Sequence, residues 1–392
     1  MAPATPKVVR WGLMATGDIA RTFAKDLLID PKSRGTEDII HVVTGVASSS
    51  SAASAERFKE EIVQPRQPSE IACNTYGSYE ELVQDPSIDL VYISSPHSHH
   101  YQNCMLALSN GKAVLCEKPV TVTSVQAHKL YEVAREKSLF FMEAVWTRFF
   151  PLSITIRQMI QDGVIGDLVR VYVNNSTGTD PEALDPSHRY LNKSLAGGAL
   201  LDIGVYTLTW LFQTLYHTQN PETRRPPHSL SSLVEFHESS GTDQMTSLVM
   251  RFDMPSNSRL KTAHGIATTS MVLPDATADG GPTVHIYGLK GEIQVWGPAH
   301  RPQSIKVIPN MIGKEAFERK FDIPAGGHGM FWEADAAARC WIAEEVECRT
   351  IPWDESILVM ETVDEIRRQA NIVYPTEIET TDYPVKLDSR PK

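Results

Sequence analysis

The first 145 residues alternate short apolar runs with helical patterns, and this alternation constrains the fold more than any other feature. Each run is long enough for a buried strand, and residues 18–28 between the first two have the apolar spacing of a helix. Such alternation is typical of a parallel sheet with helices on both faces. The sequence therefore predicts an α/β domain of the Rossmann type over residues 1–145. The expected strands are residues 7–14, 38–47, 88–94, 114–119 and 139–144.

The turn after the first strand has the pattern of a phosphate-binding loop. It consists of Ala15, Thr16, Gly17, Asp18 and Ile19, with alanine in place of the usual first glycine. Gly17 allows the backbone to approach a pyrophosphate, and the amides of the helix that starts near Asp18 can receive its charge. The loop predicts a dinucleotide site, although a lone glycine between strand and helix is common.

The second strand runs into Ser48, Ser49 and Ser50, where a cofactor with a free ribose 2′-hydroxyl usually meets an acidic residue. Serine hydroxyls together with Arg57 can donate hydrogen bonds to a 2′-phosphate. This favours NADP over NAD. The alternative is that the serines only cap the helix that begins at Ala52.

Polar residues also follow the third and fourth strands: Ser95, Pro96, His97 and His100 after one, and Glu117 and Lys118 after the other. Ligands of parallel sheets bind at the carboxyl ends of the strands, so these residues are predicted to contact the cofactor. The histidines of residues 97–100 lack a cysteine or carboxylate at ligand spacing, which disfavours a zinc site.

Asp202, Tyr206 and Lys118 are the predicted catalytic residues. Asp202 and Tyr206 are four residues apart, so on a helix they share one face. The positive charge of Lys118 favours the phenolate of Tyr206, which makes the pair suited to proton transfer. The alternative is a half-buried helix tyrosine and a surface lysine.

Trp146, Arg148 and Arg189 are predicted to contact the substrate. Trp146 and Arg148 follow the last strand of the first domain, and Arg189 precedes the Asp202 helix. An aromatic plate covers the apolar face of a sugar ring and of a dihydrodiol ring equally well. Trp146 could instead belong to an interdomain core, and Arg189 to an ordinary polar loop.

The rest of the chain, residues 146–392, is predicted to form a second domain for substrate binding and dimerisation. From about residue 229, strand follows strand with glycines and prolines between them, which indicates an open, mostly antiparallel sheet. Two closing helices are expected within residues 328–370, and the polar tail after Tyr374 is expected to be loose.

The composition is that of an intracellular enzyme. The 392 residues exceed one ordinary domain, and 42% apolar residues suffice for real cores. Five scattered cysteines indicate reduced thiols, hence a cytoplasmic protein. A net charge of −11 disfavours nucleic acid as a partner. The sequence predicts neither an apolar signal segment nor a membrane span.

These motifs together resemble the glucose–fructose oxidoreductase/inositol dehydrogenase-like (Gfo/Idh/MocA) family over nearly the whole chain. The carrying residues are the loop at 15–17, Ser95-Pro96 with His100, Glu117-Lys118-Pro119, and an aspartate four residues before the acid–base residue. Tyrosine at 206, residues 143–151 and residues 197–202 point to the branch of NADP-dependent D-xylose 1-dehydrogenases and dimeric dihydrodiol dehydrogenases. A departure is Ala52-Ala53-Ser54 after the serines, where a basic residue would favour NADP more strongly.

The resemblance implies a homodimeric NADP-dependent dehydrogenase with Tyr206 as acid/base. The implied reaction is oxidation of C1 of a D-xylose-type aldopyranose to the lactone, with a trans-dihydrodiol or a related sugar or deoxyosone as the alternative substrate. Two other classes remain open: a non-catalytic NADP(H)-binding regulator, and a glycosidase that uses a tightly held NAD. The intact set of Lys118, Asp202 and Tyr206 disfavours the first, and the missing acid after the second strand disfavours the second.

Overall fold

The computed structural model describes residues 5–274, 277 and 280–387, and divides into two compact units. Of the described residues, the first unit comprises 5–146, Ile323–Ser356 and 377–387, and the second comprises those within Thr147–Asp322 and Ile357–Thr376. The predicted boundary after residue 145 lies within a residue or two of the observed one. The prediction that residues 146–392 form one domain differs from this division, because two C-terminal segments pack with the first unit.

The first unit is built on a parallel sheet, as predicted, and this sheet has six strands. Its strand order is β3-β2-β1-β4-β5-β6, the doubly wound order that binds dinucleotides at the switch point between β1 and β4. The short β3 was not predicted, because three residues carry too little periodicity. The strands are β1 (Lys7–Met14), β2 (Ile39–Ala47), β3 (Asn74–Tyr76), β4 (Leu90–Ile93), β5 (Ala113–Glu117) and β6 (Phe141–Ala144).

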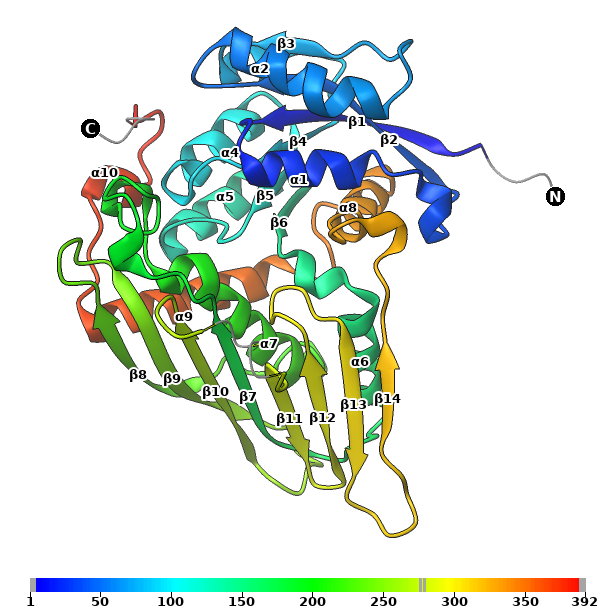
Figure 1. Cartoon of the computed structure of the whole chain (residues 1–392), viewed down its shortest axis with the longest axis vertical. Coiled ribbons are helices and arrows are strands. Elements are labelled where there is room, and N and C mark those ends of the chain that lie inside the picture. The colour runs from blue at the N-terminus through cyan, green and yellow to red at the C-terminus, as the bar shows by residue number, and fades with distance from the viewer. Residues whose placement is uncertain (1–4, 275–276, 278–279, 388–392) are drawn as a thin grey trace. The chain divides into compact units, whose positions relative to one another are not determined.

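Helices cover the sheet and complete the first unit (Figure 1). Helix α1 is amphipathic and buries Ala20, Phe23 and Leu27, while β4 is buried along its whole length, as a strand covered on both faces must be. The helices are α1 (Asp18–Leu27), α2 (Ala52–Phe58), α3 (Tyr79–Gln84), α4 (His100–Ser109), α5 (Ser124–Glu136), α8 (Phe331–Ile342) and the short α10 (Thr376–Glu379). Helix α9 (Trp353–Ala370) starts in the first unit and continues in the second.

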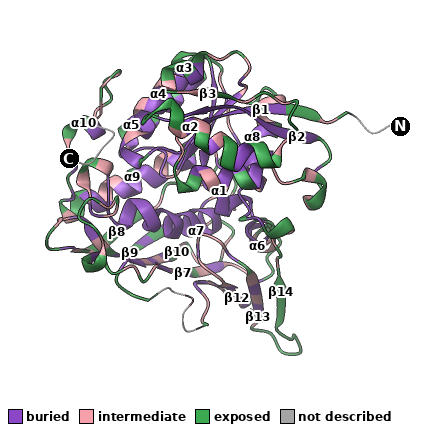
Figure 2. Ribbon diagram, turned by 45° about the horizontal axis from the view of Figure 1, so that its top comes forward, coloured by how far each residue is buried: buried purple, intermediate pink, exposed green. Residues whose placement is uncertain are grey.

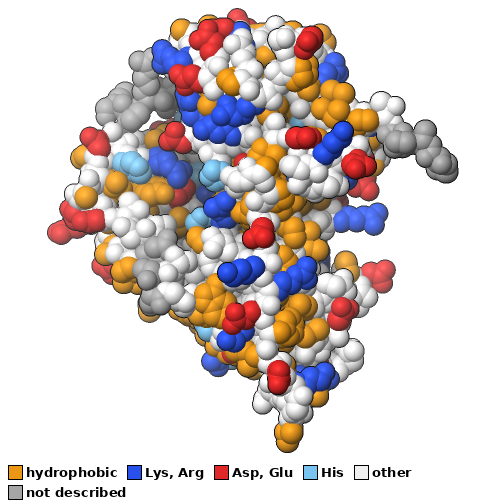
Figure 3. All heavy atoms as spheres, turned by 45° about the vertical axis from the view of Figure 1, so that its right-hand side comes forward, with side chains coloured by type: hydrophobic (Ala, Val, Ile, Leu, Met, Phe, Trp, Pro, Cys, Tyr) orange, Lys and Arg blue, Asp and Glu red, His pale blue; other side chains and the backbone are white. Residues whose placement is uncertain are grey.

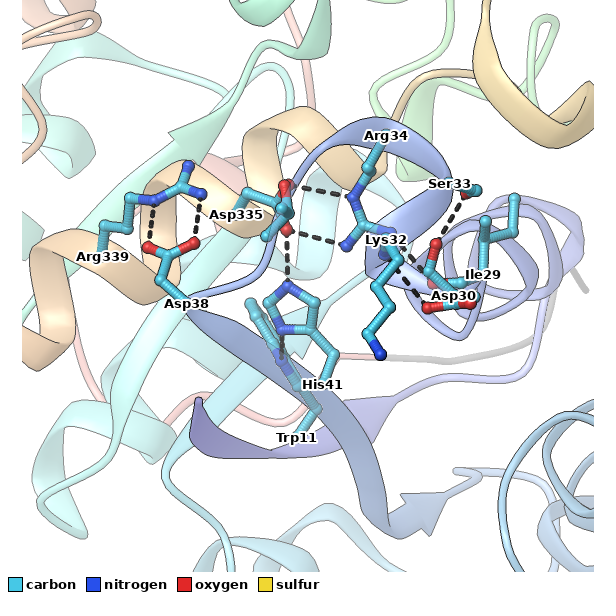
Figure 4. Close-up of polar contacts among 11 residues, drawn as sticks. Trp11, Ile29, Asp30, Lys32, Ser33, Arg34, Asp38, His41, Asp335 and Arg339 are labelled. Atoms are coloured by element: carbon cyan, nitrogen blue, oxygen red, sulfur yellow. Dashed lines mark hydrogen bonds and ion pairs between the residues drawn. The ribbon is translucent and has the colours of Figure 1, made fainter. Parts of the chain in front are cut away.

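Helix α8 is joined to the start of the chain by buried polar contacts. Asp335 binds Arg34, Thr36 and His41 at 2.8–3.0 Å, and the indole of Trp11 donates to His41 (Figure 4). The bonds from Arg34 and His41 hold the pKa of the Asp335 carboxyl below its ordinary value despite burial. This network explains why α8 belongs to the first unit, contrary to the predicted division.

A second buried carboxylate secures the segment just before α8. The carboxylate of Asp26, on α1, accepts the backbone amides of His328, Gly329 and Met330 at 2.7–2.9 Å. These amides precede helix α8 and would otherwise lack acceptors in the interior. The segment is therefore anchored to α1 at several points.

Hydrogen bonds hold residues 378–381, in the tail after Tyr374, to α4 and α5, so the expectation of a loose tail was wrong for this part. The side-chain amide of Gln126 donates to the carbonyls of Ile378 and Thr380, and Tyr101 donates to Thr381. These donors on α4 and α5 lie far from the tail in sequence, which is why a local reading did not detect the contact.

The second unit contains an eight-stranded sheet of order β14-β13-β12-β11-β7-β10-β9-β8 (Figure 1). All pairings are antiparallel except that of β7 with β10, so the predicted mostly antiparallel sheet is confirmed. Strand β14 was not predicted, because all four of its residues are exposed and show no alternation. The strands are β7 (Leu168–Ser176), β8 (His228–Phe236), β9 (Asp243–Asp253), β10 (Thr262–Ser270), β11 (Val284–Gly288), β12 (Gly291–Trp296), β13 (Ser304–Pro309) and β14 (Phe317–Lys320).

Helix α7 (Val205–Leu215) lies against β7 and β10 and forms the core of this unit, next to α6 (Pro151–Gln161). All eleven residues of α7 are buried, as its colour in Figure 2 shows. By length and composition alone the segment Lys193–Leu215 could span a membrane, which the sequence analysis did not expect; 94% of its most apolar window is buried within the protein. Such burial is characteristic of a core helix.

Candidate active site

The predicted phosphate loop lies between β1 and α1 in the first unit. Ala15 has a φ of +95°, a region that favours glycine, so the alanine adopts the conformation for which a glycine is usual here. Gly17 precedes α1, and no side chain caps the helix amides. A Cβ on Gly17 would meet no atom of the described residues within 4 Å, so packing inside the chain does not explain this glycine. Free amides and an uncrowded glycine fit a pyrophosphate.

The serines after β2 form a hydroxyl cluster beside this loop. Ser48 lies 3.4 Å from the Thr16 hydroxyl and 2.9 Å from that of Ser50, and Met14 and Ala47 are paired at the ends of β1 and β2. Ser49 is exposed next to them. The cap of α2 is provided by Ser51, so Ser48 and Ser50 are not needed for that role. A donor cluster at this strand end fits the 2′-phosphate of NADP.

Arg57 lies on the exposed side of α2, whose buried residues are Ala55 and Phe58. Within the described part of the chain, no hydrogen bond or ion pair joins it to the serine cluster. Its role in cofactor binding therefore stays a prediction.

The segments after β4 and β5 are joined by His100, which is completely buried. Its ring nitrogens lie 2.7 Å from the carbonyl oxygen of Pro119 and 2.9 Å from that of Ser95. Burial would lower the pKa of His100, but the Cys116 sulfur and the two carbonyls raise it overall. His100 thus holds the Ser95-Pro96 loop next to the exit of β5, and the buried His97 packs edge-on against its ring.

Lys118 follows β5 directly and is half-buried, while the preceding Glu117 is buried. The Glu117 carboxylate accepts the hydroxyl of Tyr92 at 2.5 Å and the backbone amide of Lys118 at 3.2 Å. These bonds fix the backbone from which the lysine projects. Among the described residues there is no group of three or more histidine, cysteine or acidic side chains that could hold a metal ion.

Asp202 and Tyr206 lie in the second unit at the start of the α7 segment, and both are buried. Asp202 is in a π-helical turn, Leu200–Gly204, and Tyr206 is in the first turn of α7. The sequence predicted a helix here but could not predict the π-turn, which occurs often at functional sites. The prediction that Asp202 and Tyr206 share one face assumed a regular α-helix, so it holds only approximately here.

Arg189 contacts Asp202, a contact that the sequence did not predict. A guanidinium nitrogen of Arg189 lies 2.8 Å from Asp202 Oδ1, and the guanidinium also lies over the ring of Tyr190. Burial and the charge of Asp202 raise the pKa of Tyr190 to about 12, so this phenol stays protonated at neutral pH. Arg189 and Asp202 form a polar pair that can bind substrate hydroxyls.

Tyr206 has a neighbour that no sequence motif predicted, His300. The ring of His300, from the loop after β12, lies with its centroid 5.5 Å from that of Tyr206. This loop is held by the indole of Trp210, which donates to Ala299, and by the hydroxyl of Thr147, which donates to His300. No pattern around residue 300 pointed to this contact.

Trp146 and Arg148 are both buried, in the short 3₁₀ turn after β6. The carbonyl of Arg148 accepts from Arg157, which in turn donates to Gln213 on α7. This burial fits a structural part for Arg148 at least as well as the predicted contact with substrate, and the assignment of both residues stays a prediction.

Comparisons with known proteins identify the family. Residues 9–145 match an oxidoreductase family with an NAD-binding Rossmann fold, and residues 153–294 match the GFO/IDH/MocA C-terminal domain. The chain belongs to the GFO/IDH/MocA family of oxidoreductases. The resemblance inferred from the sequence is thereby confirmed, and the NAD(P)-binding half is the first unit.

Two curated relatives of this family match over almost their full lengths. The chain is 47% identical to D-xylose 1-dehydrogenase (NADP⁺) of Hypocrea jecorina, covering 97% of both chains. It is 32% identical to trans-1,2-dihydrobenzene-1,2-diol dehydrogenase of Bos taurus, covering 94% of this chain and 99% of the relative. This chain is accordingly an oxidoreductase acting on CH–OH donors.

Solved structures share the fold at lower identity. The 3-ketoreductase KijD10 of Actinomadura kijaniata superimposes with a TM-score of 0.70 at 21% identity, covering 93% of this chain and 98% of that one. An NAD-binding oxidoreductase of Klebsiella pneumoniae gives a TM-score of 0.75 at 20% identity, covering 93% and 97%. These likenesses concern the fold alone.

Proposed function

We propose that this enzyme oxidises C1 of a D-xylose-type aldopyranose to the lactone, with NADP as the hydride acceptor and Tyr206 as the acid–base residue. The observation that carries the proposal is the 47% identity to the D-xylose dehydrogenase over 97% of both chains. The residues on which the chemistry depends, Lys118, Asp202 and Tyr206, are all present.

NADP is proposed as the cofactor because its parts correspond to features of the first unit. The uncapped amides of α1 and Gly17 would hold the pyrophosphate, and the hydroxyls of Ser48 and Ser50 would donate to the 2′-phosphate. When bound, the nicotinamide accepts the hydride from the carbon that is oxidised. The protein's own residues then need only bind and orient the substrate and transfer its proton.

In the proposed mechanism Tyr206 acts as the phenolate, which the positive charge of Lys118 favours, and its oxygen takes the proton from the C1 hydroxyl. Lys118 donates to the same substrate oxygen and stabilises the negative charge that develops there. The Asp202–Arg189 pair binds a neighbouring hydroxyl and so orients the ring. The lactone that forms can hydrolyse in water.

The test is a screen for NADPH formation with D-xylose, D-glucose, L-arabinose and trans-dihydrodiols, followed by Tyr206→Phe. We expect D-xylose to give the highest kcat/KM and the variant to lose roughly two to four orders of magnitude in kcat. Tyr216→Phe, at the other end of α7, is the matched control and should keep near-normal turnover. Near-normal turnover of Tyr206→Phe would refute the acid–base assignment.

A trans-dihydrodiol dehydrogenase is the second candidate, supported by the 32% identity to the bovine enzyme over 94% of the chain. An aromatic residue with hydroxyl-binding partners suits a dihydrodiol as well as a pentose. A kcat/KM for trans-dihydrodiols above that for every sugar in the screen would favour this candidate over the first.

We further propose that the enzyme is a homodimer that pairs through the face of its large sheet opposite α7. One row of outward residues crosses four strands there: Val249, Ile266, Tyr172 and His285 are register partners. Val249 and the nearby Leu233 are exposed. Light scattering after size exclusion should give twice the chain mass, and Val249→Lys should shift it toward the monomer; a monomeric parent would refute the proposal.

A cytosolic location is proposed as well, because all five cysteines are free thiols in the structure, as a reducing compartment requires. Fractionation of the source cells, with the protein followed by antibody, tests this.

On the face drawn in Figure 3, acidic and basic side chains are interspersed, which does not favour a nucleic-acid partner.

A further inference from the structure

Asp243, the first residue of β9, contacts the segment that carries Asp202 and Tyr206. Its Oδ2 accepts the backbone amide of Leu200 at 2.6 Å, and the amide of Ala199 is a further partner. Its Oδ1 lies directly against Gly198, where a Cβ would come within 2.0 Å of it. The carboxylate therefore lies at the start of the π-turn Leu200–Gly204.

This contact supplies an acceptor that the turn lacks locally. The first amides of a helical segment have no partners within the helix, and no neighbouring side chain caps this one. The acceptor comes instead from a residue 43 positions later in the chain. The turn that contains Asp202 is therefore capped by a carboxylate that is distant in the sequence.

Burial of the Asp243 carboxylate removes it from water, which disfavours its ionised form. Asp243 is buried, and Oδ1 has no hydrogen-bond partner among the described residues. Burial raises the pKa of Asp243 to about 6, opposed by the amides of Leu200 and Ala199 and by the positive charge of Arg367 on α9.

The direction of this shift decides what the ionised group does for stability. A carboxyl whose folded pKa lies above its unfolded value of about 3.9 makes the fold less stable as the pH rises between the two. At neutral pH the ionised Asp243 therefore lowers the stability of the fold. A carboxylate that only capped a helix for stability would show the opposite sign.

We propose that Asp243 is a positioning residue for the dehydrogenase reaction: through the amides of Ala199 and Leu200, its carboxylate orients the turn that carries Asp202 and Tyr206. This inference rests on the proposed function of Tyr206. It implies that protonation of Asp243 weakens the contact and lowers turnover on the acid side of about pH 6.

The charged group that faces Asp243 from α9 is part of the same arrangement. Arg367 lies over the ring of Tyr374, whose hydroxyl donates to the carbonyl of Gly197, the residue before Gly198. Tyr374 therefore contacts Gly197, and Asp243 contacts the next residue, Gly198. A shift of either support would move the start of the turn.

The test compares Asp243→Asn, which keeps the shape and one acceptor oxygen but not the charge, with Asp253→Asn at the exposed end of the same strand. For Asp243→Asn we expect kcat to fall about 10–100-fold, because small misplacements of reacting groups have effects of this size. The KM for NADP should not change, and the loss of kcat/KM below about pH 6 that we expect in the parent should be absent from the variant. The control should match the parent throughout.

Stability separates positioning from a merely structural cap. At pH 8 the unfolding midpoint of Asp243→Asn in urea should equal or exceed that of the parent, although turnover is lower. Unchanged kcat, or a lower midpoint together with an unchanged pH profile, would overturn the proposal.

Hydrogen exchange of the peptide covering residues 199–206 tests the contact without turnover. In the parent, corrected for the intrinsic pH dependence of exchange, protection of the first amides should fall as the pH drops through about 6. This measurement needs no substrate, so it stands even if Tyr206→Phe shows that the proposed acid–base role is wrong. Protection that is independent of pH would overturn the positioning role alone.

Discussion

Arg34 and Asp335 lie 301 residues apart in the sequence and form a two-bonded ion pair inside the first unit, with N–O distances of 3.0 and 2.9 Å. Both side chains are almost wholly buried. A buried pair of this kind is weak evidence of net stabilisation, but removal of one partner leaves an uncompensated charge.

Asp335→Asn should therefore lower the free energy of unfolding by about 3–5 kcal/mol, since the Arg34 guanidinium would stay buried without its counter-charge. The matched control is Asp38→Asn. It breaks the exposed ion pair of Asp38 with Arg339, which lies on α8 like Asp335. That change should cost less than about 1 kcal/mol. Urea unfolding of the three proteins measures both; equal midpoints for the two variants would contradict the expectation.

The lowered pKa of Asp335 predicts how the free energy of unfolding depends on pH. Because the folded pKa of Asp335 lies below its ordinary value, its contribution is complete above the unfolded pKa of about 3.9 and is lost as the pH falls toward the folded one. The difference in unfolding free energy between parent and Asp335→Asn should be constant above about pH 5 and shrink below pH 4. A difference that grows on acidification would be inconsistent with the shift.

Ser48→Asp should lower the kcat/KM for NADP by one to two orders of magnitude and leave NAD hardly changed. Two like charges about 4 Å apart repel by about 4 kcal/mol at an effective dielectric constant near 20, and solvent reduces this. Arg57→Ala should change the ratio in the same direction but less, because its side chain is exposed. A parent that prefers NAD, or an unchanged ratio in Ser48→Asp, would mean that the serines do not bind a 2′-phosphate.

Arg189→Ala should raise the KM for the sugar about tenfold with a smaller change in kcat, as expected for loss of one charge-assisted hydrogen bond. The KM for NADP serves as the internal control. Arg189→Lys keeps the charge but not the planar fork and should lie between parent and alanine variant. An unchanged sugar KM in Arg189→Ala would assign the Asp202 contact a structural role only.

Gly198→Ala should destabilise the fold more than Gly163→Ala. Both glycines have positive φ, +125° and +69°, but only at Gly198 would a Cβ collide, with Asp243. Gly163→Ala should lower the free energy of unfolding by about 1–2 kcal/mol, because of the positive φ alone. Urea midpoints compare the two; similar losses would show that Asp243 can move away from the glycine.

The first unit was predictable because its information is local. Buried strands, a helix of regular spacing and the Ala15–Gly17 turn each lie within a dozen residues, and they indicated the parallel sheet and five of its six strands. The second sheet followed from its glycine and proline punctuation, whereas β14 had no burial pattern to detect.

What the sequence could not indicate are contacts between distant residues. The attachment of α8 depends on Asp335 meeting Arg34, and the cap on Leu200 comes from Asp243. His300 reaches Tyr206 from a loop without any motif. The π-turn at Leu200–Gly204 likewise has no simple local signature, so the regular spacing of Asp202 and Tyr206 suggested a more regular helix than the one present.

The return of Ile323–Ser356 to the first unit bears on how the chain folds during synthesis. An N-terminal domain usually folds on the ribosome as soon as it has emerged. Here the nascent nucleotide domain would leave the charge of Arg34 without its carboxylate partner and one face of α1 uncovered until the last fifth of the chain is translated. The nucleotide domain can therefore finish folding only after almost the whole chain has been synthesised. A nascent chain stalled before residue 335 should remain a chaperone substrate.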